Sequence, residues 1–289
     1  METTRPTRDA DTLAAALAVS FDGVGSVLVA FSGGADSALV LAGAVRALGP
    51  GRVAAATAVS DAVPGAEVDA ARRLADSLGV AWHQPRTDEL SREGYRANGG
   101  DRCFFCKTEL MSVLVPLAER LGLQHVATGT NADDLRAGFR PGIRAAAAVG
   151  ALTPLADAGM TKTEVRALSA HWRLPTWDKP AAACLSSRIA YGIQITPALL
   201  HRAEAAEQAV RAELGPGARD LRVRDLGGGR ARVELDEACL DALDGPARER
   251  VAAAVRGVGH ESVELTVFRS GSMNDLLTAP GAGVGPAGT

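Results

Sequence analysis

The chain has 289 residues, of which 47% are hydrophobic and 22% charged, and its formal net charge is −3. This length can bury one large and one small hydrophobic core. The near-neutral charge excludes a strongly basic nucleic-acid-binding surface, and an aromatic content of 4% excludes a base-stacking platform. No apolar run reaches the length of a membrane span, and the first 20 residues lack a signal-peptide core. We therefore expect a cytoplasmic protein that has neither a nucleic acid nor a membrane as partner.

Strand-like and helix-like segments alternate in the first half of the chain. Four short apolar runs predict buried strands, at residues 27–30, 52–59, 80–85 and 125–130. The segment 65–78 places its apolar residues on one helical face, and a polar loop at 91–107 precedes a helix expected over 108–121. This alternation predicts an α/β fold with a doubly wound parallel sheet, which binds ligands beyond the carboxyl ends of its strands.

The first predicted strand leads into a glycine-containing loop and then into a helix-forming run at 38–48. The loop reads Ser32-Gly33-Gly34-Ala35-Asp36-Ser37. Glycines let the backbone approach an oxygen closely, serine hydroxyls donate hydrogen bonds, and a helix N-terminus favours negative charge. A lone glycine pair is more often an ordinary tight turn, whereas the whole run predicts a phosphate-binding loop. The loop lacks the lysine of the G-x-x-x-x-G-K-[ST] motif, so transfer of a γ-phosphoryl group is not implied.

A second, smaller domain is expected after Gly192. The preceding segment 174–191 is irregular, because Pro175 and Pro180 prevent a continuous helix. The elements expected after the boundary are a helix at 197–214, strands at 220–225, 230–235 and 263–268, and a helix at 238–255. The predicted organisation is therefore a large α/β domain at 1–192, a small α+β domain at 193–278 and a disordered tail at 279–289.

The four cysteines carry a second chemical signal. Cys103 and Cys106 form a C-x-x-C pair, which places two thiols on one turn. A structural zinc site, a redox-active dithiol and an iron–sulfur cluster all use this spacing, and the spacing does not choose among them. Cys184 lies in the irregular segment, whereas the helical context of Cys239 predicts a buried packing position.

Arginines are the candidate ligands of the small domain. Arg222 and Arg224 alternate along one predicted strand, so both point to the same face of the sheet, and Arg269 ends the last strand. Arginine suits bidentate binding of a phosphate or carboxylate. On the sequence alone, solvated charges on an exposed sheet face are an equally good interpretation.

Taken together, these motifs resemble the LarE-type ATP-dependent sulfur transferases of the PP-loop ATP pyrophosphatase superfamily, which has the adenine nucleotide α-hydrolase-like fold. The resemblance covers nearly the whole chain, through the motifs SGGADS, RCFFCK, TGTNADD, TKTEVRALS, WDKPAAACLSSRIAYG, RVR and FRSGSMND. It implies an enzyme that adenylates the carboxylates of pyridinium-3,5-biscarboxylic acid mononucleotide, releases pyrophosphate and replaces AMP with sulfur. This reaction belongs to the synthesis of the nickel-pincer nucleotide cofactor. The resemblance further implies a homo-oligomer, a hexamer.

The resemblance also implies roles for individual residues. The loop residues Ser32, Gly33, Gly34, Asp36 and Ser37 are expected to hold the phosphates of ATP and Mg²⁺, with Asp36 as the magnesium ligand. The phosphate end of the substrate is expected to contact Arg222, Arg224 and Arg269.

Two sulfur sources are implied by different branches of the family. In one branch a single cysteine gives up its own sulfur, and that position is Ala183 here, one residue before Cys184. In the other branch three cysteines hold a 4Fe–4S cluster whose open iron carries an extra sulfide for transfer. Cys103, Cys106 and Cys184 match that second branch, which we favour, with sulfide or another sulfur donor as co-substrate and Cys184 at the reaction centre.

Three other functions fit part of the sequence. A tRNA thiolase could use Cys103 and Cys106 as a sulfur relay, but the net charge of −3 does not support tRNA binding. A sacrificial sulfur transferase could consume Cys184 itself. A nucleotide-binding regulatory module would keep the phosphate loop without any sulfur chemistry.

Overall fold

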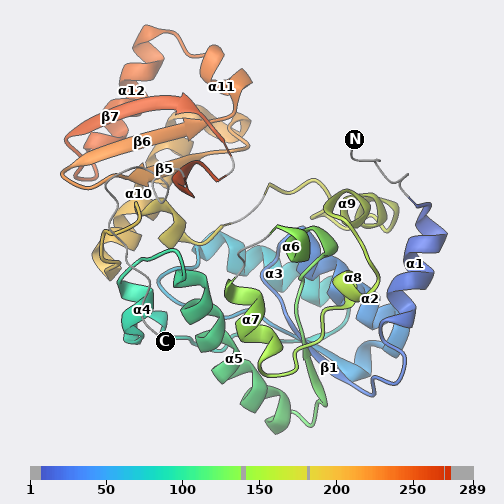
Figure 1. Ribbon diagram of the computed structural model, residues 1–289. Coiled ribbons are helices and arrows are strands. Elements are labelled where there is room, and N and C mark those ends of the chain that lie inside the picture. Colours follow the sequence, from blue (N-terminus) through green and yellow to red (C-terminus); the bar gives the residue numbers. More distant parts are fainter. Residues whose placement is uncertain (1–7, 138–140, 181–182, 270, 275–289) are drawn as a thin grey trace. The chain divides into compact units, whose positions relative to one another are not determined.

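The computed structural model describes residues 8–137, 141–180, 183–269 and 271–274, and the structural statements below concern these residues (Figure 1). The chain forms two compact units. The first unit comprises Met1–Asp88 and Cys103–Ala182, and the second comprises Glu89–Arg102 and Ala183–Thr289. Within the described part of the chain, no helix is both long and apolar enough to cross a membrane.

The first unit is built on a four-stranded parallel sheet with the strand order β3-β2-β1-β4. The strands are β1 (Val27–Ala30), β2 (Val53–Ala56), β3 (Ala81–His83) and β4 (His125–Ala127). In the register, Val27 lies opposite Val53 on one side and His125 on the other. The central strands are apolar and buried because helices cover both faces of a parallel sheet. The predicted α/β fold is confirmed, with strands shorter than the apolar runs that predicted them.

The first unit also contains several helices. They are α1 (Ala10–Val19), α2 (Ala35–Leu48), α3 (Gly65–Ser77), α5 (Arg102–Arg120), α6 (Ala132–Arg136), α7 (Pro141–Ala147), α8 (Pro154–Asp157) and α9 (Lys162–His171). Val27 and Val29 belong to one core, which includes residues of α1, α2, α3 and α9. Leu28 belongs to a second core with residues of α5, because successive side chains of a strand point to opposite faces.

Helix α5 differs from its predicted bounds, because it begins at Arg102 and not at residue 108. Cys103 and Cys106 therefore lie on the first two turns of this helix and not in a preceding loop. The polar and glycine-rich composition of 91–107 concealed the helix start.

The second unit contains a three-stranded sheet with the order β5-β6-β7. Its elements are α4 (Glu93–Arg96), α10 (Pro197–Leu214), β5 (Arg222–Asp225), β6 (Arg230–Leu235), α11 (Glu237–Asp241), α12 (Gly245–Arg256) and β7 (Ser262–Val267). β5 and β6 form the predicted antiparallel hairpin, and β7 runs parallel to β6. The helix expected over 238–255 is two helices, because Asp244 caps a new helix by accepting a hydrogen bond from the Ala247 N–H at 2.7 Å. Short 3₁₀ helices occur throughout the chain, at Pro50–Arg52, Glu89–Ser91, Leu185–Arg188, Gly215–Gly217 and Ser272–Asn274.

The division between the units differs from the boundary expected at Gly192. The second unit starts at Ala183 and also takes in Glu89–Arg102. Asn98 ties the two segments together, since its Nδ2 donates to the carbonyls of Ala190 and Ile193 at 2.8 and 2.9 Å. Composition alone could not reveal this long-range attachment. The expected disordered tail at 279–289 lies outside the described residues.

Candidate active site

The predicted phosphate loop connects β1 to the N-terminus of α2. Gly33 has a φ of 71°, a conformation that favours glycine, and Gly34 is the N-cap of α2 without a side-chain cap. Ser37 orders the loop, since its Oγ donates to the Gly34 carbonyl at 3.2 Å and lies 3.1 Å from the Ser32 Oγ. The loop therefore presents the first-turn N–H groups of a 14-residue helix, which is the arrangement that binds phosphate oxygens.

A second loop, after β4, packs directly against this helix terminus. A Cβ atom at Gly129 would lie 2.8 Å from the backbone nitrogen of Ser37 and 3.1 Å from the Asp36 carbonyl carbon. Only glycine permits this approach. It brings Asn131, the N-cap of α6, to the phosphate loop, where its Nδ2 donates to Asp36 Oδ1 at 3.1 Å.

Asp36, the predicted magnesium ligand, is engaged by protein groups on both carboxylate oxygens. Asn131 contacts Oδ1, and the Lys162 ammonium forms an ion pair with Oδ2. The backbone N–H of Lys162 donates to Asp133 Oδ2 at 2.7 Å, so two carboxylates adjoin this lysine. Carboxylate oxygens are the ligands that Mg²⁺ prefers, and Asp36 and Asp133 are the residues that could hold it beside bound phosphates.

A second lysine, Lys179, contacts the loop at Gly33. Lys179 Nζ donates to the Gly33 carbonyl at 3.0 Å and to Glu67 Oε2 at 2.6 Å. Arg166 supports this segment by donating to the Lys179 carbonyl at 3.1 Å. Neither Lys162 nor Lys179 was assigned a role from the sequence, although both lie in motifs that carry the family resemblance.

The cysteines are distributed over both units. Cys103 is exposed and Cys106 partly buried on α5 of the first unit, and Cys184 is the N-cap of the 3₁₀ helix Leu185–Arg188 of the second unit. Desolvation lowers the pKa of the Lys107 ammonium, and the adjacent Cys106 opposes this effect. Cys239 is partly buried and packs against the core of the second unit, and burial raises the pKa of its thiol.

The three-cysteine cluster receives no support from the structure. A cluster needs several thiolates gathered at one place. Among the described residues, no group of three or more Cys, His, Asp or Glu side chains is arranged to hold a metal ion. The described residues therefore give no support to a 4Fe–4S cluster, and no chemical step is assigned to one.

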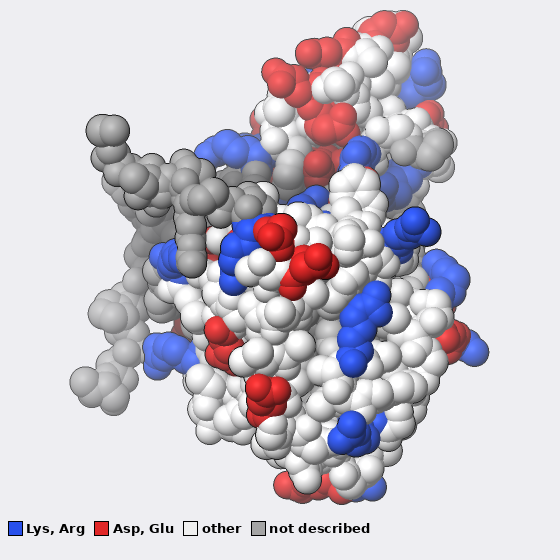
Figure 2. All heavy atoms as spheres, turned by 90° about the vertical axis from the view of Figure 1, so that its right-hand side faces the viewer, with Lys and Arg blue, Asp and Glu red and all other residues white. Residues whose placement is uncertain are grey.

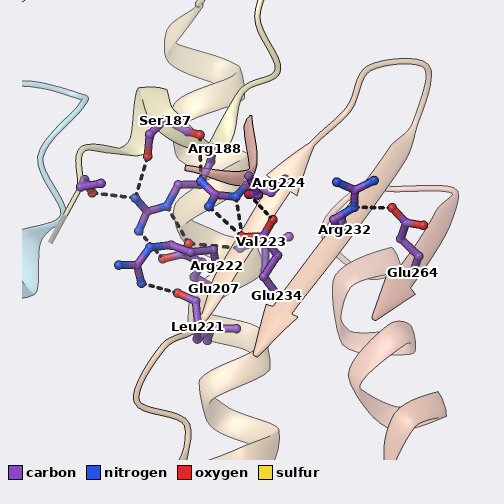
Figure 3. A network of polar contacts seen from close by, with 12 residues as sticks. Ser187, Arg188, Glu207, Leu221, Arg222, Val223, Arg224, Arg232, Glu234 and Glu264 are labelled. Carbon is purple, nitrogen blue, oxygen red and sulfur yellow. Dashed lines mark hydrogen bonds and ion pairs between the residues drawn. The ribbon is translucent and has the colours of Figure 1, made fainter. Parts of the chain in front are cut away.

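The second unit contains a buried network of arginines and glutamates (Figure 3). Arg224 Nε and Nη2 donate to Glu234 Oε2 at 2.9 and 2.7 Å, and its Nη1 donates to the Ser187 carbonyl. Arg188 pairs with Glu207 through two hydrogen bonds of 2.8 and 3.2 Å. Arg222 and Arg224 are only 6% and 5% exposed, which excludes the interpretation as solvated surface charges.

Arg222 is also a buried cation of this network. Burial lowers the pKa of its guanidinium, and the neighbouring Arg188 lowers it further. It lies over the Phe268 ring at 5.4 Å and donates to the Leu221 carbonyl at 2.6 Å. In the network of Figure 3, the guanidinium groups of Arg188 and Arg224 are paired with the carboxylates of Glu207 and Glu234. The carboxylates of Glu207 and Asp220 favour the charged form of Arg222. Arg269 is exposed beyond the end of β7.

The face drawn in Figure 2 bears scattered charges. The lysine and arginine side chains of the described residues on that face are separated from one another and interspersed with aspartates and glutamates. This distribution does not form the continuous basic surface that an RNA-modifying enzyme uses.

A parallel α/β sheet whose first strand leads into an S-G-G-x-D-S loop at a helix N-terminus defines a nucleotide-binding domain of the PP-loop class. A family model described as NAD synthase matches residues 13–188. An uncharacterized protein of Synechocystis sp. is 39% identical over 254 residues, which cover 87% of this chain and 92% of that protein. The pyridinium-3,5-bisthiocarboxylic acid mononucleotide synthase of Lactiplantibacillus plantarum is 36% identical over 255 residues. These residues cover 87% of this chain and 90% of that synthase. The chain therefore belongs to the NAD synthase (PP-loop) family and, within it, to the LarE-type proteins that its motifs resemble.

Proposed function

We propose that the protein is an ATP-dependent sulfur transferase that acts on pyridinium-3,5-biscarboxylic acid mononucleotide. The observation that carries this proposal is the phosphate loop at the N-terminus of α2, in a chain that is 36% identical to a synthase of the bisthiocarboxylic acid mononucleotide. The reaction converts each carboxylate to a thiocarboxylate in two steps, adenylation and sulfur transfer.

Adenylation turns a poor electrophile into a reactive one. A carboxylate oxygen of the substrate attacks the α-phosphorus of ATP, and the bond to the β-phosphate oxygen breaks, which releases pyrophosphate. The N–H groups at the start of α2 and the hydroxyls of Ser32 and Ser37 bind the departing phosphates. Mg²⁺ held by Asp36 and Asp133 would neutralise part of their charge.

The arginine network of the second unit is proposed to bind the phosphate of the mononucleotide. Arg222 supports this role because it is buried beside the guanidinium groups of Arg188 and Arg224, and an anionic ligand would relieve the repulsion among these cations. In this proposal the ion pair with Glu234 fixes the position of Arg224, and Arg269 contacts the substrate phosphate from the exposed end of β7.

Sulfur transfer requires a nucleophile that displaces AMP from the adenylate. We propose that it comes from the cysteine set Cys103, Cys106 and Cys184, with Cys184 at the reaction centre. The family resemblance alone supports a cluster-bound sulfide. Iron and acid-labile sulfide in anaerobically prepared protein would support that source. Conversion of Cys184 to dehydroalanine during turnover, with its sulfur transferred to the thiocarboxylate product, would instead identify a sacrificial cysteine.

The test is product analysis with ATP, Mg²⁺, a sulfide source and the biscarboxylate nucleotide. We expect AMP, pyrophosphate and a thiocarboxylate product identified by mass. Asp36→Asn keeps the shape of the side chain but removes its charge, so turnover should be abolished while the thermal unfolding midpoint stays near that of the wild type. Formation of ADP and phosphate would contradict the proposal.

A further inference from the structure

Cys184 lies in a turn, residues 183–188, whose backbone carbonyls accept hydrogen bonds from arginines. Arg188 Nη1 donates to the Cys184 carbonyl at 3.1 Å, and Arg102 Nη1 donates to the Ser186 carbonyl at 3.0 Å. Arg188 belongs to the network of Figure 3, but Arg102 comes from a distant part of the chain, at the first position of α5. Because hydrogen bonds from a charged donor are stronger than those from a neutral one, two elements hold this turn firmly.

Arg102 differs from the other buried arginines of the second unit in its partners. It is 5% exposed, and its Nη1 also donates to the Asn98 side-chain oxygen, while its guanidinium lies 5.4 Å from the centre of the Tyr191 ring. Within the described chain none of its contacts is to a carboxylate, whereas Arg188 and Arg224 are paired with glutamates. A buried cation without a carboxylate depends on neutral acceptors, so the carbonyl of the turn is a main partner of Arg102.

Asn98 orients Arg102 and also holds the chain that follows the turn. Asn98 is fully buried and has a φ of 55°, a left-handed conformation that few residues other than glycine adopt and that asparagine tolerates best. Its Nδ2 donates to the carbonyls of Ala190 and Ile193 at 2.8 and 2.9 Å. Such a backbone conformation persists where the surrounding contacts fix it, and it clusters at functional sites.

Tyr95 holds the turn at a second point. Its hydroxyl forms a hydrogen bond with the Ser186 hydroxyl, and both side chains are fully buried. Ser186 is therefore held through its side chain by Tyr95 and through its carbonyl by Arg102. Since two residues of extended chain span at most about 7 Å, fixing Ser186 restricts where Cys184 can lie.

We propose that Tyr95, Asn98 and Arg102 are positioning residues that hold the Cys184 thiol in place for sulfur transfer. This inference rests on the proposed function, in which Cys184 lies at the reaction centre. The contacts that define these three residues lie within the second unit, whereas the phosphate loop belongs to the first. Their loss should therefore impair sulfur transfer and spare adenylation.

Two partial reactions separate positioning from a general loss of the fold. Exchange of labelled pyrophosphate into ATP, with the biscarboxylate nucleotide present, measures adenylation, and mass spectrometry of the thiocarboxylate measures sulfur transfer. Arg102→Met should lower the rate of sulfur transfer by about 100-fold, the loss that a small displacement of a reacting group causes, and leave the exchange rate unchanged. Arg102→Lys keeps the charge and one donor for the Ser186 carbonyl, so part of the rate should return. Tyr95→Phe removes a single hydroxyl and should show the same split with a smaller loss.

Alkylation of Cys184 by iodoacetamide gives a measurement that needs no turnover. The full-length protein is treated without substrates, and peptide mass spectrometry follows Cys184 separately from the other cysteines. Arg102→Met should speed up this alkylation, because a released turn exposes the thiol more often. Tyr95→Phe should speed it up to a smaller extent.

The matched control is Arg248→Met in α12 of the second unit. Arg248 also donates to two backbone carbonyls, those of Leu240 and Leu243 at 2.8 and 3.1 Å, but these lie outside the turn of Cys184. This control should leave the alkylation rate and both partial reactions like those of the wild type.

Alkylation of Cys184 at the wild-type rate in Arg102→Met would overturn the assignment. An equal loss of adenylation and sulfur transfer in Arg102→Met and Tyr95→Phe would overturn it as well, and if Arg102→Met does not fold, Tyr95→Phe decides. A wild type that forms no thiocarboxylate would overturn the proposed function, while faster alkylation in the two variants would still support the positioning of the turn.

Discussion

Replacing Arg224 by alanine removes one partner of a buried ion pair. Arg224 and Glu234 are joined by hydrogen bonds of 2.9 and 2.7 Å, and their side chains are 6% and 1% exposed. The substitution leaves Glu234 with a hydrogen bond of 2.7 Å from the Ser272 hydroxyl on its other oxygen. Because a buried charge without its partner is strongly unfavourable, we expect the free energy of unfolding to fall by about 3–5 kcal/mol.

The neighbouring strand offers a matched control for this experiment. Arg232 lies opposite Arg224 in the β5–β6 register and pairs with Glu264 at 2.5 Å, but these side chains are 32% and 55% exposed. Arg232→Ala should therefore cost only about 0–1 kcal/mol. Urea unfolding followed by circular dichroism measures both values under the same conditions.

A second substitution separates the buried charge from simple loss of packing. Glu234→Gln in the Arg224→Ala background removes the uncompensated carboxylate and should restore part of the lost stability. The reasoning would be refuted if Arg224→Ala cost no more than Arg232→Ala. Further destabilisation by the second substitution would refute it equally.

Three further perturbations test the loop and the ionisable groups. Gly129→Ala places a Cβ atom 2.8 Å from the Ser37 nitrogen, so the displaced loop should lower the adenylation rate by about 100-fold, and an unchanged rate would contradict the close approach. Burial raises the pKa of Glu164, but hydrogen bonds from Arg8 and from backbone N–H groups outweigh burial and lower it to about 2. Since the pKa of Glu164 is depressed in the folded state, its ionised carboxylate stabilises the fold above about pH 4.5, and this stabilisation is lost as the pH falls towards 2. Arg8→Ala should therefore lower the free energy of unfolding by up to about 3 kcal/mol at pH 7 and by little near pH 2. Urea unfolding at the two pH values measures this difference. Desolvation also lowers the pKa of His260, so the free energy of unfolding of the wild type should fall as the pH drops below about 6.5. His260→Gln should make this fall in stability with pH less steep. An equally steep fall in both proteins would show that His260 is not responsible.

The parts of the site that consecutive residues form could be predicted from the sequence, whereas the parts that distant residues form could not. The strand, the glycine pair and the helix start of the loop are consecutive, so propensity and pattern place Ser32–Ser37 correctly. The lysines could not be placed in this way, because Lys162 and Lys179 are 126 and 146 residues from their loop partners Asp36 and Gly33. Only the packing of α9 and of the segment after it brings these cations to the loop.

The arginine network shows a different limit of sequence reasoning. Alternation along β5 correctly puts Arg222 and Arg224 on one face, but it does not say what covers that face. The cover comes from Glu207 of α10 and Glu234 of β6, whose ion pairs make burial of the arginines possible. A similar limit applies to Glu89–Arg102, which belongs to the second unit through long-range contacts such as the hydrogen bond from Asn98 to the Ala190 carbonyl, and no local pattern predicts such contacts.

The most direct test of the account follows the oxygen of the substrate carboxylate. The enzyme is given biscarboxylate nucleotide labelled with ¹⁸O in its carboxylates, together with ATP, Mg²⁺ and a sulfide source. If the carboxylate is adenylated and sulfur then displaces AMP, one labelled oxygen must leave with each AMP, and mass spectrometry should find singly labelled AMP and unlabelled pyrophosphate. Unlabelled AMP, or label in inorganic phosphate, would show that the carboxylate oxygen does not attack the α-phosphorus and would contradict the central claim.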